Sequence, residues 1–292
     1  MDNKGKNKMG ELLLAAKITH VPTMLLSERP GRLEGKRQQA IDGHKEIGRR
    51  MRALGVDTVV VIDTHWLVNA GFHVNANAHF KGVYTSHEFP HFIQNLAYEY
   101  DGNPVLGDLI AEKATAKGVM TLSHQVETLD LEYGTLVPMR YMNQASDLKV
   151  VSVAGWCSVH NLNDSRTLGV AIREAIEASD SKVALLASGS LSHKIWENEL
   201  YEANNGTFTI SREFNRQVDL RVLELWQKGE IATFLKMLPD YAQHCAGEGN
   251  MHDTAMLFGA LGWDEYKGRG ELIGEYFPSS GTGQCNVVFP VT

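Results

Sequence analysis

The sequence has few cysteines and no long apolar run. Its three cysteines, Cys157, Cys245 and Cys285, are scattered and lack the C-x-x-C spacing of zinc or redox motifs. This small, odd number fits reduced thiols, so we expect a cytoplasmic protein. No apolar stretch approaches the roughly 20 residues that span a bilayer, which argues against a membrane protein. The polar first residues give no sign of a signal peptide, and we expect residues 1–8 to form a flexible tail.

The sequence also lacks an excess of positive charge. It carries 28 Lys and Arg against 35 Asp and Glu, a net charge of −7, so we expect no nucleic-acid or anionic-membrane partner. The hydrophobic content of 43% is typical of a globular protein with a proper core. There is no internal repeat and no linker rich in Pro, Gly or Ser. Residues 9–292 are therefore predicted to form one domain.

Apolar, β-forming runs alternate with stretches of helical periodicity. The strand-like runs are residues 12–18, 58–62, 149–153, 182–187, 271–277 and 286–291. The helix-like stretches are residues 34–54, 104–117, 164–178 and 211–228. Between them, the polar and histidine-rich segment 69–96 is predicted to form loops and short strands. This alternation predicts an α/β fold whose sheet is covered by helices on both faces.

Three histidines follow predicted strands. His20 follows the first, His65 lies in "VVVIDTHW" after the second, and His193 follows a later one. In open α/β sheets, ligands bind beyond the carboxyl ends of the strands, so these side chains could meet in one site. A single histidine at a strand end is more often a hydrogen-bonded surface residue. Asp63, beside His65, could orient its surroundings or cap the following turn.

Glu248 lies between two glycines in "CAGEGNMHD". Flanking glycines let the backbone pass close to another group and direct the carboxylate outward, but an acid at a helix start has the same pattern. Two histidines and one carboxylate form the facial triad of non-heme Fe(II) oxygenases, which leaves metal positions open for substrate and O₂. Zinc accepts the same ligands, so the residue types alone do not select the metal.

Six motifs in order give the sequence a family resemblance from about Met9 onward. They are "KITHVP", "DTHW", "LEYGTLVPMRYM", "SGSLSH", "GEGNMHD" and "FPSSGTGQ". The sequence thereby resembles the class III (LigB-type) extradiol catechol dioxygenases. The resemblance implies a mixed central sheet with helices on both faces, Fe(II) as cofactor, a catecholic substrate and O₂. Enzymes of this kind usually assemble from several subunits, so we also expect a homo-oligomer.

The resemblance also implies roles for particular residues. His20, His65 and Glu248 match the metal ligands, and His193 matches the active-site base, a role that a neutral imidazole suits near pH 7. His124 resembles a second active-site histidine. The sequence departs from the family where many relatives read Asp-His-Gly and this chain has Glu132, Tyr133 and Gly134. That departure affects the hydrogen bonding expected around His124.

An acidic side chain on the catechol would require a cation or a cluster of hydrogen-bond donors. Arg140 in "VPMRYM" is one candidate, although an arginine at this position could equally be structural. Ser280 and Thr282 in "PSSGTGQ" are the others, since hydroxyls and backbone N–H groups can bind a carboxylate. The same segment could instead be a tight turn between two strands.

Two other functions compete with ring cleavage. A zinc hydrolase could use His20, His65 and Glu248 to activate water. A binding module could share the fold without the oxygenase chemistry, although the retention of His193 with the full triad argues against it. An extradiol dioxygenase acting on a different catechol is a third possibility.

Overall fold

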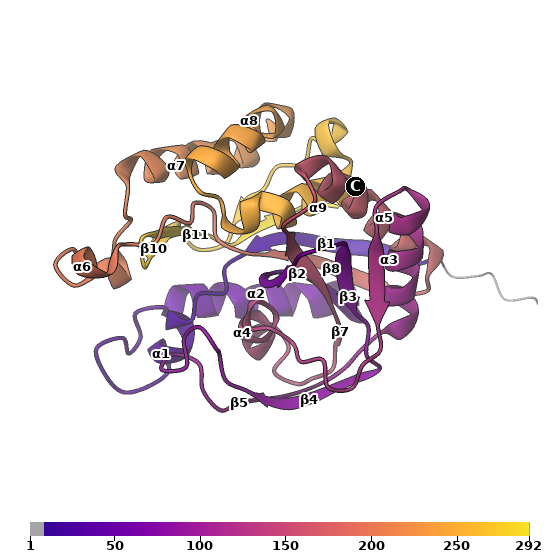
Figure 1. The fold of residues 1–292 in the computed structure, drawn as a ribbon, viewed down its shortest axis with the longest axis horizontal. Coiled ribbons are helices and arrows are strands. Elements are labelled where there is room, and N and C mark those ends of the chain that lie inside the picture. The colour runs from indigo at the N-terminus through magenta and orange to yellow at the C-terminus, as the bar shows by residue number, and fades with distance from the viewer. Residues whose placement is uncertain (1–8, 292) are drawn as a thin grey trace, which may run out of the picture.

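The fold is described from a computed structural model, which describes residues 9–291 (Figure 1). The tail predicted for residues 1–8 lies outside the described residues. In the described part of the chain, no helix is long and apolar enough to cross a membrane.

A mixed eight-stranded sheet forms the centre of the molecule, with strand order β6-β3-β7-β2-β8-β1-β12-β9. Its strands are β1 (Glu11–Ile18), β2 (Thr58–Val68), β3 (Phe72–Asn75), β6 (Thr121–His124), β7 (Lys149–Cys157), β8 (Lys182–Ser188), β9 (Glu271–Leu272) and β12 (Val287–Phe289). The central strands β1, β8, β2 and β7 pair in parallel, whereas β12 joins β1 antiparallel and β3 joins β7 antiparallel. Their carboxyl ends therefore meet at one edge, as expected for a site in an α/β fold.

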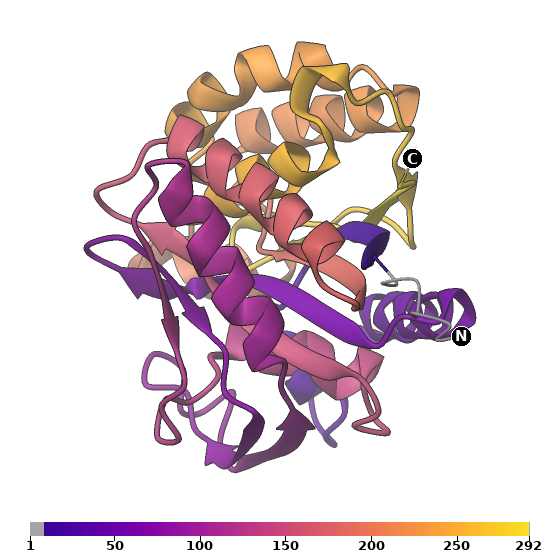
Figure 2. The same ribbon diagram turned by 90° about the vertical axis from the view of Figure 1, so that its right-hand side faces the viewer.

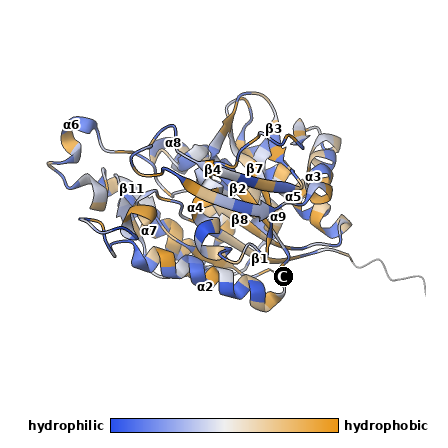
Figure 3. Cartoon of the chain, turned by 90° about the horizontal axis from the view of Figure 1, so that it is seen from below, coloured by the Kyte–Doolittle hydropathy of each residue, from blue (hydrophilic) through white to orange (hydrophobic). Residues whose placement is uncertain are grey.

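Helices cover both faces of this sheet, which confirms the predicted α/β class (Figure 1). One face carries α3 (Pro104–Ala116), α5 (Leu162–Ala178) and α9 (His252–Leu261), with α7 (Glu213–Lys228) and α8 (Ile231–His244) outside them, seen in orange in Figure 2. The other face carries α2 (Gln38–Leu54) and α4 (Tyr133–Met142). Figure 3 shows hydrophilic and hydrophobic residues alternating along α2, the pattern of a helix that buries one face.

The remaining elements are short. They are α1 (Thr23–Ser27), α6 (Asn198–Tyr201), the 3₁₀ turns η1 (Gly206–Phe208), η2 (Glu248–Met251) and η3 (Trp263–Glu265), and the strand pairs β4 (His79–Tyr84) with β5 (Leu96–Asp101) and β10 (Phe277–Ser279) with β11 (Thr282–Gln284). In Figure 1, α1, α6, β10 and β11 lie toward the left side of the molecule.

Local sequence rules account for several element ends. The side chain of Asn103 accepts a hydrogen bond from the N–H of Leu106, and Pro104 opens α3, as the cap-and-proline pattern predicts. Helices α2 and α7 end at Gly55 and Gly229, both with left-handed φ.

Other boundaries differ from prediction. The strand predicted for 58–62 continues to Val68 through a register shift between Asp63 and Leu67, so His65 lies within a strand rather than beyond it. The run 271–277 divides into β9 and the start of β10 because Gly274, at φ 85°, turns the chain between them.

Candidate metal centre and catalytic cavity

His20, His65 and Glu248 converge at the carboxyl end of the central strands. Each offers one ligand atom, and the three atoms lie within 4.8 Å of one another. The Nε2 atoms of His20 and His65 lie 3.1 Å and 3.4 Å from Oε1 of Glu248. The ligands come from the loop after β1, from β2 and from η2, so the sheet brings together residues far apart in the sequence.

A run of left-handed backbone places Glu248. Ala246, Gly249, Asn250 and Met251 all have φ between 49° and 62°, a costly conformation for three non-glycine residues that is typical of functional sites. A Cβ on Gly249 would lie 3.1 Å from Cγ2 of Thr64, so glycine permits this close approach. Helix α9 begins at His252, after the 3₁₀ turn that contains Glu248.

Hydrogen bonds fix the orientation of the Glu248 carboxylate. Thr64 donates to Oε1 at 2.6 Å, and the backbone N–H of Ser190 donates to Oε2. The side chain is buried, and both donors come from the strand ends that carry the histidines. The carboxylate is therefore held in one orientation before any ligand arrives.

Each histidine also has a supporting contact. Nδ1 of His20 lies 2.9 Å from Oγ of Ser188, which donates to the carbonyl of Gly134. This contact leaves Nε2 directed at Glu248. The N–H of His65 donates to Oδ1 of Asp63 at 2.9 Å, while Oδ2 accepts from Thr135 at 2.7 Å. Asp63 is buried and orients the β2 backbone at His65, so it takes the orienting role considered for it.

The electrostatics of the triad favour a cation. Burial, reinforced by His20, lowers the pKa of His65 to about 3, so its imidazole is neutral. Burial alone would raise the pKa of Glu248, but His20, His193 and His65 hold it well below its usual range. Burial would likewise lower the pKa of His20, yet Glu248 raises it. The ionised carboxylate thus favours positive charge beside it, and a divalent metal would supply that charge in place of the proton on His20.

A cavity of about 580 Å³ opens beside the triad. Its wall includes His20, His65, His193 and Tyr133 on the metal side. A cavity of this size accommodates a substituted catechol. Nε2 of His193 lies 3.8 Å from Oε2 of Glu248, and the backbone N–H of His193 donates to the carbonyl of Ala246. His193 therefore faces the cavity beside the triad, the place expected for a base.

Ser280 and Thr282 also line this cavity, as predicted for substrate-binding residues. Ser280 and Gly281 form the tight turn between β10 and β11 with positive φ, and Thr282 begins β11. The interpretation of "PSSGTGQ" as a tight turn therefore fits the structure, in which the hydroxyl of Thr282 donates to the carbonyl of Ser279. Oγ of Ser280 lies 3.1 Å from the hydroxyl of Tyr201, which also lines the cavity.

The structure does not bring His124 to the cavity, contrary to expectation. His124 ends β6, the edge strand three positions from β2, which is roughly 14 Å at the usual strand spacing. Its ring stacks on His73, with 2.6 Å between Nε2 of His124 and Nδ1 of His73. The prediction failed because strand order in the sheet, rather than position in the sequence, decides which strand ends are neighbours.

Arg140 also lies away from the cavity. It is on α4, forms an ion pair with Glu28 at 2.7 Å, and lines a separate depression beside β5. Arg140 follows Tyr133 by seven positions, or about two helical turns, so its side chain is displaced along the helix from the metal. The alternative, that this arginine is structural, fits this placement.

Sequence reasoning did not assign a role to Tyr133. Its ring lies 3.8 Å from that of His65 between centroids and edge-on to His20, and its hydroxyl lies 3.4 Å from Glu88. Burial raises the pKa of Tyr133, so the hydroxyl stays protonated and can donate a hydrogen bond. The sequence signal that could have identified Tyr133 was the replacement of the family's Asp-His-Gly by Glu132, Tyr133 and Gly134. Tyr133 takes the histidine position of that motif and faces the proposed metal ligands.

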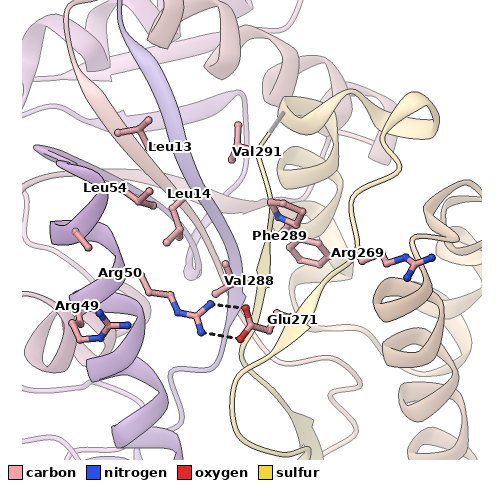
Figure 4. Close-up of a pocket in the computed structure, with 12 residues that line it drawn as sticks. Leu13, Leu14, Arg49, Arg50, Leu54, Arg269, Glu271, Val288, Phe289 and Val291 are labelled. Carbon is pink, nitrogen blue, oxygen red and sulfur yellow. Dashed lines mark hydrogen bonds and ion pairs between the residues drawn. The ribbon is translucent and has the colours of Figure 1, made fainter.

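Another cavity, of about 430 Å³, lies between α2 and the C-terminal strands (Figure 4). Its floor is apolar, with Leu14, Val288 and Phe289 among the side chains shown. At its rim, Arg50 forms a bidentate ion pair with Glu271 at 2.6 and 2.8 Å. No histidine lines it, so it lacks the metal-ligand chemistry of the first cavity.

Comparisons with known proteins agree with this geometry. Residues 14–290 match the family described as the catalytic LigB subunit of aromatic ring-opening dioxygenase. The chain is 56% identical to 3,4-dihydroxyphenylacetate 2,3-dioxygenase of Escherichia coli, over 89% of this chain and 94% of the relative. It is 24% identical to the 2-aminophenol 1,6-dioxygenase beta subunit of a Pseudomonas species, over 91% and 92% of the two chains.

The solved structures include a similar fold. A crystal structure of an uncharacterized protein from Escherichia coli K12 superposes with a TM-score of 0.62 at 15% identity, covering 94% of this chain and 99% of that one. At this identity the similarity concerns the fold alone.

Proposed function

The chain belongs to the family of catalytic LigB subunits of aromatic ring-opening dioxygenases, and from this premise we propose its reaction, metal and site residues. It is an extradiol dioxygenase that uses O₂ to cleave 3,4-dihydroxyphenylacetate between ring carbons 2 and 3. The product of this cleavage is 5-carboxymethyl-2-hydroxymuconic semialdehyde. Residues 9–292 act as one catalytic domain.

The observation that carries the site assignment is the convergence of His20, His65 and Glu248 beside a cavity that also contains His193. We assign the three converging residues as ligands of Fe(II). When bound, this metal lowers the pKa of the catechol hydroxyls and provides open positions for catechol and O₂. The family implies a catalytic metal, and ring-opening dioxygenase relatives favour iron over the zinc of a hydrolase.

His193 and Tyr133 provide the proton chemistry in this proposal. Nε2 of His193 takes the proton of a catechol hydroxyl and later returns it to the opening ring. The protonated hydroxyl of Tyr133 donates a hydrogen bond to a substrate oxygen beside the triad. The cavity wall around them holds the ring in one orientation and limits the access of water.

The test combines reconstitution with metal and measurement of O₂ uptake. Protein prepared without metal should regain activity with Fe(II) and not with Zn(II), and should consume one O₂ per ring-opened product, identified by mass and yellow absorbance. Activity with Zn(II), or product without O₂ uptake, would contradict the proposal. Equal kcat/KM for plain catechol and for 3,4-dihydroxyphenylacetate would remove only the substrate preference.

Two further proposals concern the oligomeric state of the protein and its location in the cell. The family description names a subunit, and we propose that this chain forms a homo-oligomer. Light scattering of the purified protein tests this, and a monomer mass would contradict it. We also propose a cytoplasmic location, supported by three buried cysteines that are all free.

A further inference from the structure

Two cationic side chains are buried among the described residues, and they differ in their partners. Lys17 forms an ion pair with the buried carboxylate of Asp253. Arg37, only 5% exposed, has no carboxylate within ion-pair distance in residues 9–291. Burying an unpaired charge is costly, and proteins ordinarily pair such charges or direct them at a ligand.

Neutral groups surround the Arg37 guanidinium. It lies 5.2 Å and 5.0 Å from the ring centroids of Phe208 and Phe277, a cation–π arrangement. Nε donates to Oγ1 of Thr23 at 3.0 Å, and Nη2 donates to the carbonyl of Thr207 at 2.7 Å. Nη1 has no hydrogen-bond partner within the described part of the chain. Burial lowers the pKa of Arg37 only to about 10, so the group is charged at neutral pH.

The backbone adds to the positive potential at this place. Arg37 is the N-cap of α2, whose first turn contains no acidic residue. A helix N-terminus carries partial positive charge and is stabilised by acidic neighbours rather than by a cation. Positive charge is therefore concentrated here, and no carboxylate of residues 9–291 lies within ion-pair distance of the guanidinium to offset it.

This charge lies directly behind the cavity wall. Thr23 and Thr207, which accept hydrogen bonds from Arg37, both line the catalytic cavity. Because Oγ1 of Thr23 accepts a hydrogen bond from the guanidinium, the hydroxyl proton of Thr23 remains available to donate to another group. Oγ of Ser279, another wall residue, lies 3.4 Å from Oγ1 of Thr23. The hydroxyl of Thr23 thus lies between the guanidinium and the cavity.

We propose that Arg37 determines substrate specificity by favouring catechols whose ring carries an anionic side chain, acting through the hydroxyls of Thr23 and Ser279. This inference rests on the proposed function, because it takes the same cavity as the substrate site. In it, the carboxylate of the substrate is the missing counter-charge of Arg37. Arg37 is a positioning residue, whereas the hydroxyl of Thr23 makes the contact.

A second arginine, Arg32, also lines the cavity but is less suited to this role. Its side chain is 64% exposed, and it already donates to Oδ1 of Asn205 and lies 3.8 Å from Glu202. Solvent and salt screen an exposed charge strongly, so it discriminates weakly between substrates. Arg32 therefore serves as the rival in the experiment.

The experiment compares two substrates with similar rings, 3,4-dihydroxyphenylacetate and the uncharged 4-methylcatechol. For each variant the measured quantity is the ratio of their kcat/KM values. Arg37→Met should lower this ratio roughly 10- to 100-fold, mainly through a higher KM for the acetate-bearing substrate, because it removes the charge behind the Thr23 hydroxyl, and charge-assisted hydrogen bonding has effects of this size. Arg140→Met removes a guanidinium that is paired outside the cavity and should leave the ratio unchanged.

Thr23 provides a test that does not depend on the folding of Arg37→Met. Thr23→Val keeps the side-chain shape and removes the hydroxyl, so the ratio should fall, whereas Thr23→Ser should retain it. An equal loss for both substrates in Arg37→Met would mean a structural role and overturn the proposal. An unchanged ratio in Thr23→Val, or the larger change in Arg32→Met, would overturn it as well.

Binding separates this inference from the proposed reaction. Anaerobic titration calorimetry of the metal-loaded protein gives the Kd of each catechol without turnover. The wild-type protein should bind the acetate-bearing catechol more tightly than 4-methylcatechol, and Arg37→Met should lose that preference. A protein that shows this preference but opens neither ring would contradict the proposed function alone. No preference in the wild type would overturn the role of Arg37.

Discussion

Two pairs of histidines have nearly equal ring separations but differ in ring orientation and in the groups that their nitrogens face. His20, in the loop after β1, and His65, on β2, have ring centroids 4.8 Å apart and meet edge-on. His73 on β3 and His124 on the edge strand β6 have ring centroids 4.9 Å apart and are stacked. The first pair faces the buried carboxylate of Glu248, whereas the nitrogens of the second pair meet each other.

The difference shows that histidine proximity alone does not make a metal site. At the central pair, supporting hydrogen bonds aim two nitrogens at one carboxylate oxygen, so three lone pairs converge. At the edge pair, stacking and partial exposure leave no common point for a cation. Burial, a carboxylate and orientation by neighbouring groups make the distinction.

Replacing Glu248 should have the largest effect on this comparison. Glu248→Ala leaves two ligands, so the folded protein should lose its metal and all activity, as should alanine at His20 or His65. The matched control, His124→Ala, should bind as much iron as wild type. Metal analysis alongside near-ultraviolet circular dichroism measures both, and full iron content in folded Glu248→Ala would refute the ligand assignment.

His193 should separate catalysis from metal binding. His193→Ala should keep its iron and still bind catechol, while turnover falls roughly 10²- to 10⁴-fold, the usual effect of losing a general acid–base. Stopped-flow turnover and anaerobic catechol binding provide the measurements. If the folded variant lost its iron, His193 would have to be reassigned as a ligand.

A third pair, His160 and His252, extends the comparison to stability. Both rings contact Phe72, and burial lowers the pKa of His252 to about 4. Below about pH 6.5, His252 binds a proton in the unfolded chain. In the folded protein His252 stays neutral until the pH falls to about 4. His252 therefore contributes stability above pH 6.5 that is lost as pH falls toward 4, by roughly 3 kcal/mol.

Urea unfolding of wild type and His252→Gln tests that window. The free energy of unfolding should fall more steeply in the wild type between pH 6.5 and 4, and the two slopes should agree above pH 7. Parallel curves across the whole range would show that His252 does not titrate in this way.

Tyr133 and His124 give the smallest expected effects. Tyr133→Phe removes one hydrogen bond to the substrate, so kcat should fall about tenfold, equivalent to roughly 1.4 kcal/mol. His124→Ala should change kcat less than about twofold, because the residue lies at the edge strand. A larger loss in His124→Ala than in Tyr133→Phe would restore His124 as the second active-site residue.

Much of the site could be predicted from local sequence. The strand-end positions of His20 and His193, the acid between two glycines at Glu248, and the hydroxyls of Ser280 and Thr282 are local features with local physical causes. The six family motifs, which occur in order along the chain, then implied a role for each of these residues. His124 and Arg140 were misplaced because their locations depend on strand order and on how α4 packs along the sheet, which no local pattern reports.

The sequence by itself determined the α/β class, the capped ends of α2, α3 and α7, and the residue types of a facial triad, because periodicity and turn chemistry act over a few neighbours. Only the tertiary structure decided which histidines share a carboxylate, that Tyr133 faces them, and that Arg37 is buried with no ion-pair partner among residues 9–291. Those facts depend on contacts between residues far apart in the chain, which form when the sheet assembles and its two faces are covered.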